Sequence, residues 1–210
     1  MSEKIFREIK MFYIKYGKRL FDLFLVFLTI PIWLPVFFLV YIVVFIHGRP
    51  VFYHGERIGK DLKTFKIVKF RTMAIDSGNE RSGDTVFEGD KRVGKMGGFL
   101  RKYKLDEIPQ LFLVLSGKMS LVGPRPELPI YVDREYYYKH GISDLRPGIT
   151  DFSSIKFRDL SSIIPKGDTN TFVKERIIPQ KNKLRKFYAE RVSFCTDLII
   201  ILRTLKSILR

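Results

Sequence analysis

The chain has 210 residues, enough for one domain and an additional anchor segment, and its 46% hydrophobic content excludes a disordered protein. Its 38 Lys and Arg against 22 Asp and Glu give a formal net charge of +16, which suits anionic partners. A single cysteine, Cys195, excludes an intramolecular disulfide and a cysteine-rich zinc site.

The first predicted element is an apolar helix. Residues Leu23 to Ile46 are 24 consecutive residues without a charge. As a helix they would be about 36 Å long, enough to cross a hydrocarbon core of about 30 Å. A buried core helix is the plainer alternative. A cleaved signal peptide fits poorly, because the run is long and follows a 22-residue polar leader.

Two prolines and the flanking charges decide how this helix meets the membrane. Pro31 and Pro35 each remove a helical N–H, so we expect a break near residues 29–31. Residues 1–22 carry six basic groups and residues 47–71 carry seven. Basic flanks prefer the cytoplasmic side, which favours a re-entrant hairpin over a single span. At the start of the run, Lys18, Arg19 and Asp22 are expected to pair with one another or with lipid head groups.

A small β-hairpin is predicted next. Pro50–Tyr53 and Thr64–Arg71 have the pattern of two strands, with the turn around Gly55 and Gly59. Residues 74–92 have the composition of a long polar loop.

A helix is then expected from Asp106 or Glu107 to Gly117, since Pro109 is tolerated only in a first turn. Two adjacent carboxylates at a helix start feel the positive end of the helix dipole, which favours their ionised forms. Ionised oxygens suit a magnesium ion or a nucleophile. The alternative is that Asp106 is only a helix N-cap.

Arg125 is a second candidate site residue, because Pro124 and Pro126 restrict the backbone on both sides of it. A fixed guanidinium suits bidentate phosphate recognition, whereas a tight turn with a solvated arginine is the plainer reading. Four other basic residues are candidates to complete a pocket for an anionic ligand: Lys69, Arg71, Arg101 and Arg146.

The remaining chain is expected to be irregular over residues 118–183 and to end in one basic amphipathic helix, Leu184–Arg210. The apolar face of that helix either packs in the core or lies on the membrane surface.

Five motifs in register now give a resemblance. The chain resembles the bacterial sugar transferases, monotopic polyprenyl-phosphate phosphoglycosyl transferases, in their small catalytic-core form, through Lys18-Arg19-Leu20-Phe21-Asp22, Lys69-Phe70-Arg71-Thr72-Met73, Leu105-Asp106-Glu107-Ile108-Pro109-Gln110-Leu111, Ser120-Leu121-Val122-Gly123-Pro124-Arg125-Pro126-Glu127 and Arg146-Pro147-Gly148-Ile149-Thr150.

The resemblance implies transfer of a sugar 1-phosphate from a nucleotide diphosphate sugar, usually a uridine one, to polyprenyl (undecaprenyl) phosphate, with release of UMP. Asp106 would be the nucleophile that forms an aspartyl phosphosugar, and Mg²⁺ would lie near Asp106 and Glu107. Arg125 would bind phosphate oxygens, with Arg101 and Lys69 as helpers. The product would start a membrane glycan such as exopolysaccharide, O-antigen, capsule or glycoprotein sugar.

The expected fold is mixed α/β and mainly helical, with a re-entrant membrane helix within residues 1–46 and a catalytic domain over 47–210 that carries a short hairpin and interfacial amphipathic helices. The expected location is the cytoplasmic face of the bacterial inner membrane, with lipid as a partner and no nucleic acid. The sequence leaves the oligomeric state open. A non-catalytic basic module that is tethered to the membrane and binds anionic lipid or nucleic acid is the alternative function.

The chain departs from the family pattern at two places. After Thr150, residues 151–159 replace the usual Gly-aromatic-Gln-Val-x-Gly-Arg stretch, which leaves the sugar open. Ile30-Pro31 stands where some members have Ser-Pro, so one hydroxyl that could satisfy a freed backbone carbonyl is missing.

Overall fold

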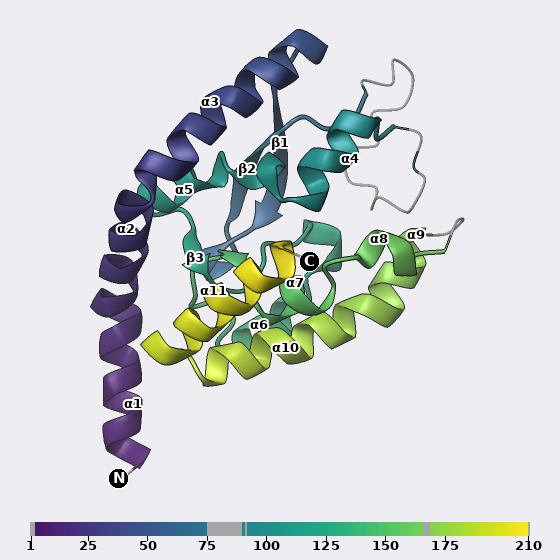
Figure 1. The fold of residues 1–210 in the computed structure, drawn as a ribbon. Helices are drawn as coiled ribbons and strands as arrows, with labels where there is room; N and C mark the ends of the chain where they lie inside the picture. The colour runs from purple at the N-terminus through teal and green to yellow at the C-terminus, as the bar shows by residue number, and fades with distance from the viewer. Residues whose placement is uncertain (1–2, 75–89, 91, 166–168, 210) are drawn as a thin grey trace.

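The N-terminal part of the chain, residues 3–47, is a long bent helix. In the computed structural model, which describes residues 3–74, 90, 92–165 and 169–209, α1 (Glu3–Phe12), a π-helical turn (Tyr13–Gly17) and α2 (Lys18–Leu28) form one continuous rod. A second helix, α3 (Ile30–His47), leaves that rod at an angle along one side of the molecule (Figure 1). The predicted break near residues 29–31 is therefore confirmed.

Side chains satisfy the backbone at this break. Pro31 lies in the first turn of α3, where a missing N–H costs nothing, while Pro35 lies inside the helix. The Thr29 hydroxyl donates to the Leu25 carbonyl at 2.7 Å, and Trp33 Nε1 donates to the Val26 carbonyl at 3.1 Å. Thr29 and Trp33 thus supply the hydrogen bonds that the missing serine hydroxyl would have provided.

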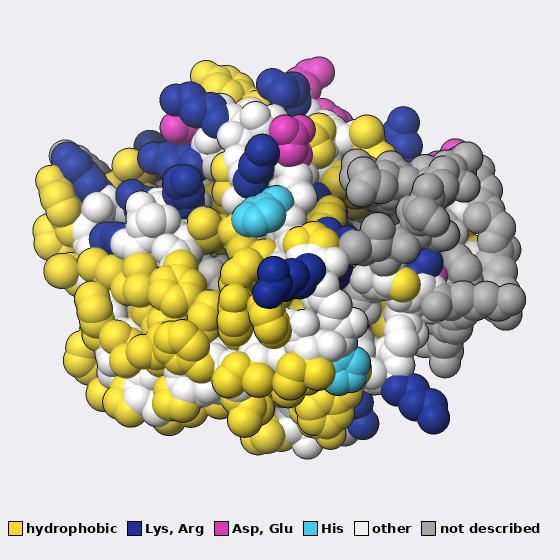
Figure 2. Space-filling view, turned by 90° about the horizontal axis from the view of Figure 1, so that it is seen from above, with side chains coloured by type: hydrophobic (Ala, Val, Ile, Leu, Met, Phe, Trp, Pro, Cys, Tyr) yellow, Lys and Arg dark blue, Asp and Glu magenta, His cyan; other side chains and the backbone are white. Residues whose placement is uncertain are grey.

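Helix α3 is long and apolar enough to cross a membrane, with a mean hydropathy of 2.3, and only 17% of it is buried. Its buried residues, Trp33, Val40 and Val44, pack on the domain, whereas Ile32, Phe38, Leu39, Ile42 and Ile46 are exposed. Figure 2, which looks onto the upper end of the molecule, shows hydrophobic side chains gathered over the lower left and most charged ones above them. A large exposed apolar surface of this kind indicates a hydrophobic partner.

The predicted hairpin is present, with different bounds. Strands β1 (Phe52–Ile58) and β2 (Thr64–Phe70) are antiparallel, and Glu56 pairs with Lys66. The prediction was wrong in placing Gly55 at the turn: it lies inside β1, and the turn runs from Gly59 through the 3-10 turn Lys60–Leu62. Of the expected polar loop, residues 75–89 and 91 lie outside the described residues.

The expected helix over residues 106–117 is two short pieces. After α4 (Lys95–Lys102), a 3-10 turn (Leu105–Glu107) precedes α5 (Gln110–Leu115), because Pro109 begins a new helix as its N-cap. The predicted stop at Gly117 is confirmed, since Gly117 has a left-handed backbone with φ of 77°. Arg19 and Arg146 donate to the last carbonyls of this segment, those of Val114, Leu115 and Gly117.

The prediction that residues 118–183 are irregular was wrong. This stretch contains a two-stranded parallel sheet and short helical segments: β3 (Ser120–Val122), a 3-10 turn (Pro129–Tyr131), α6 (Arg134–Lys139), β4 (Gly148–Thr150), α7 (Phe152–Lys156), α8 (Leu160–Ile163), α9 (Thr169–Phe172) and a π-helical turn (Val173–Ile177).

Gly123 follows strand β3 and Gly148 begins strand β4, and the backbones of these two glycines are in contact. A Cβ on Gly148 would lie 2.1 Å from the backbone nitrogen of Gly123, and a Cβ on Gly123 would lie 2.4 Å from the Arg146 carbonyl oxygen. No side chain fits at either position, so these two glycines set how closely β4 approaches the end of β3.

The C-terminal prediction of one helix was also wrong, because there are two. Helix α10 (Ile178–Glu190) ends before α11 (Phe194–Ile208), and Ser193 caps α11 by accepting from the Thr196 N–H at 3.2 Å. Ile200 faces the core, while the opposite face of α11 is exposed and apolar, with Phe194, Leu198, Leu202, Leu205 and Leu209. That exposed face excludes core packing as the role of those side chains.

A buried ion pair joins the two ends of the chain. Lys18 Nζ of α2 lies 2.5 Å from Asp197 Oδ2 of α11, and neither side chain is more than 5% exposed. Tyr13 and Tyr188 each donate a hydroxyl to Asp197 at 2.7 Å. Asp22 accepts from the Ser120 hydroxyl at 2.7 Å. Lys18, Arg19 and Asp22 therefore bind the globular part, and Lys18 also attracts the Asp22 carboxylate, as expected of residues that pair with one another.

The fold is thus mixed α/β and mostly helical, with a small β-hairpin and one apolar N-terminal helix, as expected.

Candidate active site

Asp106 and Glu107 lie side by side in the 3-10 turn between α4 and α5, and both are buried, at 5% and 6% exposure. A left-handed Lys104, with φ of 58°, begins this turn, and Pro109 begins the next helix. Because the residues at the N-cap positions are Lys104 and Pro109, Asp106 caps neither helix. Two adjacent buried carboxylates need another reason to be there.

Glu107 is held by two cations from other elements. Lys69 Nζ of β2 lies 2.8 Å from Glu107 Oε1, and Arg125 donates from Nη1 to Oε2 at 3.0 Å and from Nη2 to Oε1. Burial by itself would raise the pKa of Glu107, but Arg125, Lys69 and Lys104 outweigh it and hold the pKa well below its usual value. Glu107 is therefore ionised at neutral pH.

Asp106 differs from its neighbour in having a free oxygen. Asp106 Oδ1 is buried and has no hydrogen-bond partner among the residues that the structure describes. Burial raises the pKa of Asp106, and the charge of Glu107 adds to this, while Lys69, Lys104 and Arg101 act in the opposite direction. A buried carboxylate oxygen that is left unpaired beside several cations is suited to bind or attack an anionic group.

Arg125 is fixed at both its backbone and its side chain. Its N–H donates to Asp151 Oδ2 at 3.1 Å, and Nη1 also donates to the Ile149 carbonyl at 2.7 Å. With its two bonds to Glu107, the guanidinium is oriented by β4 on one side and by the carboxylate on the other. The alternative of a solvated arginine in a turn does not describe this residue.

The other predicted basic residues lie at different distances from the pair. Arg101 of α4 donates from Nε to the Thr72 hydroxyl at 2.7 Å and is one of the cations around Asp106. Arg71 follows β2 and has a buried Nε without a partner. Arg146 donates to the Gly117 carbonyl at the end of α5. The structure thus brings Lys69, Arg101 and Arg125 to the carboxylates and places Arg146 elsewhere.

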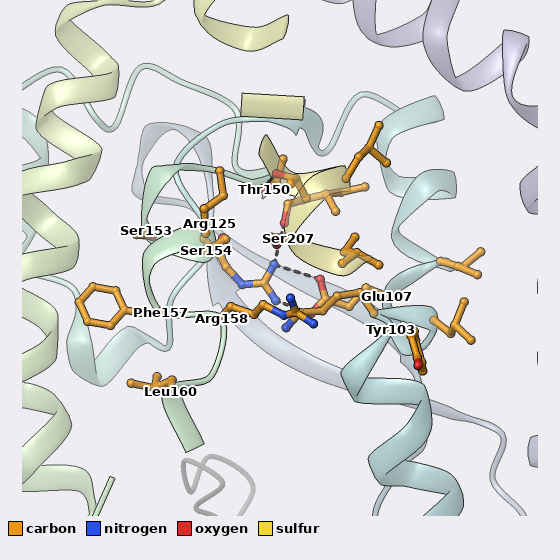
Figure 3. A pocket seen from close by; sticks show the side chains of 18 of the residues that line it. Tyr103, Glu107, Arg125, Thr150, Ser153, Ser154, Phe157, Arg158, Leu160 and Ser207 are labelled. Atoms are coloured by element: carbon orange, nitrogen blue, oxygen red, sulfur yellow. Dashed lines mark hydrogen bonds and ion pairs between the residues drawn. The ribbon is translucent and has the colours of Figure 1, made fainter. Parts of the chain in front are cut away.

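A cavity of about 550 Å³ opens on one side of Glu107 and Arg125. Neither Asp106 nor the predicted Arg71, Arg101 and Arg146 are among its lining residues, so it meets the carboxylate pair at Glu107. Its polar lining includes the hydroxyls of Thr150, Ser153 and Ser154 (Figure 3). A mixed cavity with a few convergent polar groups is typical of a ligand site.

Three cations of this cavity were missed by sequence reasoning: Lys104, Arg158 and Lys181. In Figure 3 the side chains of Arg125 and Arg158 point toward Glu107. With 38 basic residues in the chain, no local signal singles these three out, although Arg158 belongs to the segment 151–159 that departs from the family pattern.

A further carboxylate, that of the half-buried Glu127, binds Lys181, which lines the cavity. Glu127 accepts from Lys181 Nζ and from Arg185 Nη2, each at 2.7 Å, and Arg185 also donates to the Tyr137 hydroxyl at 2.8 Å. Burial would raise the pKa of Glu127, but Lys181 and Arg185 lower it to about 2. This cluster links α10 to the loop that carries Arg125.

Comparison with known proteins gives a family match over residues 13–210, to the model described as bacterial sugar transferase. One relative is the UDP-N-acetylgalactosamine-undecaprenyl-phosphate N-acetylgalactosaminephosphotransferase of Aeromonas hydrophila, 31% identical over 91% of this chain and 43% of its own length. Another is the undecaprenyl-phosphate galactose phosphotransferase of Salmonella typhimurium, 30% identical over 93% of this chain and 41% of its own.

A third relative, the exopolysaccharide production protein ExoY of Sinorhizobium fredii, is 32% identical over 91% of this chain and 85% of its own length. The chain spans about two-fifths of the length of the Aeromonas and Salmonella proteins. The names of these three relatives give no support to the alternative of a non-catalytic binding module.

Proposed function

This chain belongs to the bacterial sugar transferase family and is by family a transferase, and on that premise we propose that it moves a sugar 1-phosphate from a uridine diphosphate sugar to polyprenyl phosphate and releases UMP. The observation that carries the proposal is the unpaired, buried Asp106 Oδ1 beside a Glu107 that two cations hold ionised. In the proposed reaction Asp106 and Glu107 have different functions, and their different hydrogen-bond and ion-pair partners support this.

Asp106 is the proposed nucleophile. Its carboxylate oxygen attacks the sugar-bearing phosphorus, the bond from that phosphorus to the bridging oxygen breaks, and UMP leaves with the electron pair. An oxygen of polyprenyl phosphate then attacks the same phosphorus, which releases Asp106 and leaves a polyprenyl diphosphosugar. Two displacements through a covalent intermediate replace one transfer between bulky anions, so the kinetics should be ping-pong.

The surrounding cations have distinct proposed roles. Arg125 is held at both ends, so its guanidinium can bind phosphate oxygens without reorganising. Lys69 contacts Glu107 and also lies close enough to Asp106 to stabilise its ionised form. Arg101 also acts on Asp106 and is the third cation proposed to stabilise the negative charge that develops on the leaving UMP.

Magnesium is the proposed cofactor, and the residues present fit it. The described residues contain no group of three His, Cys, Asp or Glu that could hold a metal ion. Magnesium, however, is commonly bound by one or two carboxylates together with substrate phosphates, and Asp106 has an oxygen without a partner. Asp106 and Glu107 would hold the ion, which would neutralise diphosphate charge.

The membrane arrangement is also proposed. Residues 1–46 would form the re-entrant anchor, with the break at Thr29 turning the chain back, and residues 47–210 the catalytic domain on the cytoplasmic face of the inner membrane. The exposed apolar sides of α3 and α11 support this, because both need a hydrophobic environment. Such an anchor would keep the carboxylates at the depth of a lipid-bound phosphate.

The experiment that tests the reaction measures UMP release by the purified protein with Mg²⁺, undecaprenyl phosphate and a panel of uridine diphosphate sugars. Repeated turnover should depend on one sugar and on lipid, since without lipid only one UMP per protein molecule can be released, and Asp106→Asn should abolish release altogether. Asp61→Asn, an exposed carboxylate in the hairpin turn, is the matched control and should keep full activity. Undiminished release by Asp106→Asn, or a phosphosugar trapped on another residue, would refute the assignment.

A further inference from the structure

The cavity beside Glu107 has two walls of different chemistry. One wall is cationic and hydroxyl-rich and includes Arg125, Arg158 and Lys181. The other is mainly hydrocarbon, and comes from the segment around the 3-10 turn and α5 on one side and from the last turns of α11 on the other: Leu105, Ile108, Leu111, Leu205 and Ile208. Thr204 and Ser207 of α11 lie between these apolar residues, and Phe157 and Leu160 line the cavity on the side of Arg158 (Figure 3). A ligand that fills this cavity would therefore be anionic at one end and apolar at the other.

The hydrocarbon wall continues out of the cavity. Leu205 lines the cavity and is also 53% exposed, so it belongs both to the wall and to the outer face of α11. One turn further, Leu209 is exposed as well. On the other side Tyr103 lines the cavity, and its ring lies 4.9 Å from that of the exposed Phe99. The wall is thus an apolar path from the surface to the cations.

We propose that this wall binds the first isoprene units of the acceptor lipid, with its phosphate at Arg125 and Arg158. The inference rests on the proposed function and adds the residues that hold the acceptor. Of the two substrates, only the lipid phosphate joins an anion directly to a hydrocarbon chain, whereas a nucleotide sugar is polar at both ends. Only the lipid also needs an apolar path that remains open to the surface.

Two leucines on one helix give a matched test. Leu205 and Leu202 both belong to α11 and are 53% and 57% exposed, but only Leu205 lines the cavity. Leu205→Asn and Leu202→Asn would be compared in detergent, with geranyl phosphate, which has only two isoprene units, as the acceptor. Each lost methylene contact should weaken acceptor binding about fourfold.

The two half-reactions are measured separately. The burst of UMP without acceptor reports donor use, and transfer to geranyl phosphate reports acceptor use. Leu205→Asn should leave the burst unchanged and raise the half-saturating concentration of geranyl phosphate about fourfold or more, while Leu202→Asn should match the unaltered protein. Independently of turnover, a photoreactive amino acid in place of Leu205 should cross-link to geranyl phosphate, and one in place of Leu202 should not.

Three results would overturn the inference. A burst slowed by Leu205→Asn as much as the transfer would assign the wall to the donor. If Leu205→Asn and Leu202→Asn raised the half-saturating concentration of geranyl phosphate equally, the effect would come from the apolar surface of α11 in general and not from the cavity wall. Absence of any burst from the folded, unaltered protein would refute the proposed function, and this inference with it.

Discussion

Replacing Asp197 with asparagine should strongly destabilise the protein without touching the candidate site. Asp197 is fully buried and accepts hydrogen bonds from Lys18, Tyr13 and Tyr188. Asp197→Asn removes the only anion within ion-pair distance of the Lys18 ammonium among the described residues, and Asp22 is then the nearby anion that still attracts this buried charge. Breaking a buried ion pair in this way costs about 3–5 kcal/mol.

For a chain of this size each kcal/mol lowers the melting temperature by about 2–4 °C, so the expected loss is about 6–20 °C. The assay is thermal unfolding of the purified protein in detergent. Asp159→Asn is the control: it removes an ion pair between the exposed Asp159 carboxylate and Arg158 Nε, 3.8 Å apart, and should melt at the same temperature as the unaltered protein.

A second variant separates charge from packing. Lys18→Met together with Asp197→Asn removes both charges of the pair and should recover most of the loss, because the Lys18 ammonium is then no longer buried without its ion-pair partner, while Asp22 keeps its hydrogen bonds from Ser120 and Leu121. A melting temperature of Asp197→Asn within about 2 °C of that of the unaltered protein, which is about a third of the smallest expected shift, would refute the reasoning. A double variant no more stable than the single one would also refute it.

Three further predictions concern the site, its support and the anchor. Arg125→Lys should lower turnover about 10- to 100-fold, since one ammonium replaces a guanidinium that makes two bonds to Glu107, and wild-type turnover in a UMP assay would contradict this. Because the pKa of Glu127 is lowered to about 2, its ionisation contributes about 3 kcal/mol to the free energy of unfolding above pH 5, and this contribution is lost as the pH falls from 5 toward 2. Glu127→Gln should therefore flatten the plot of stability against pH between pH 5 and pH 2. An unchanged plot in this variant would contradict the prediction. With Cys195 replaced by serine, cysteines in place of Glu8 and Lys60 should react with an impermeant reagent from the cytoplasmic side only, whereas labelling from opposite sides would exclude the re-entrant path.

Local patterns in the sequence predicted the local elements. The proline pair gave the helix break, because a missing N–H acts within one turn. The alternation from Thr64 gave β2, and Gly117 gave the end of α5. Gly55 was misplaced because a glycine inside a strand and a glycine in a turn look alike in sequence.

The parts that sequence reasoning missed depend on contacts between distant residues. Strands β3 and β4 have three residues each, too few to show a period, and they pair across 25 intervening residues. Lys18 and Asp197 are 179 positions apart. The division between α10 and α11 did have a local signal, since Ser193 is a good N-cap residue, but the continuous hydrophobic spacing around it masked that signal.

The candidate site divides in the same way. Asp106, Glu107 and Arg125 were found because neighbouring prolines and paired charges mark them in the sequence. Lys104, Arg158 and Lys181 reach the cavity only through folding, from segments that carry no distinguishing pattern. Asp106 could be recognised as a candidate from sequence. Its unpaired oxygen, and the lowered pKa that distinguishes its neighbour Glu107, are visible only in three dimensions.

The contact between Gly123 and Gly148 has a consequence for how this protein can diversify. Arg125 and Thr150 both line the cavity, and each lies two residues beyond one of these glycines, so the distance between them is set by this contact between two backbones. Because a Cβ at either glycine would collide with the backbone of the other strand segment, a side chain there would have to displace the segment that carries Arg125 or Thr150. Helix α7 begins only after that contact, at Phe152, so its side chains can vary while the contact stays intact. The α7 side of the cavity, which includes Ser153 and Ser154, can therefore change while the spacing of Arg125 and Thr150 stays the same.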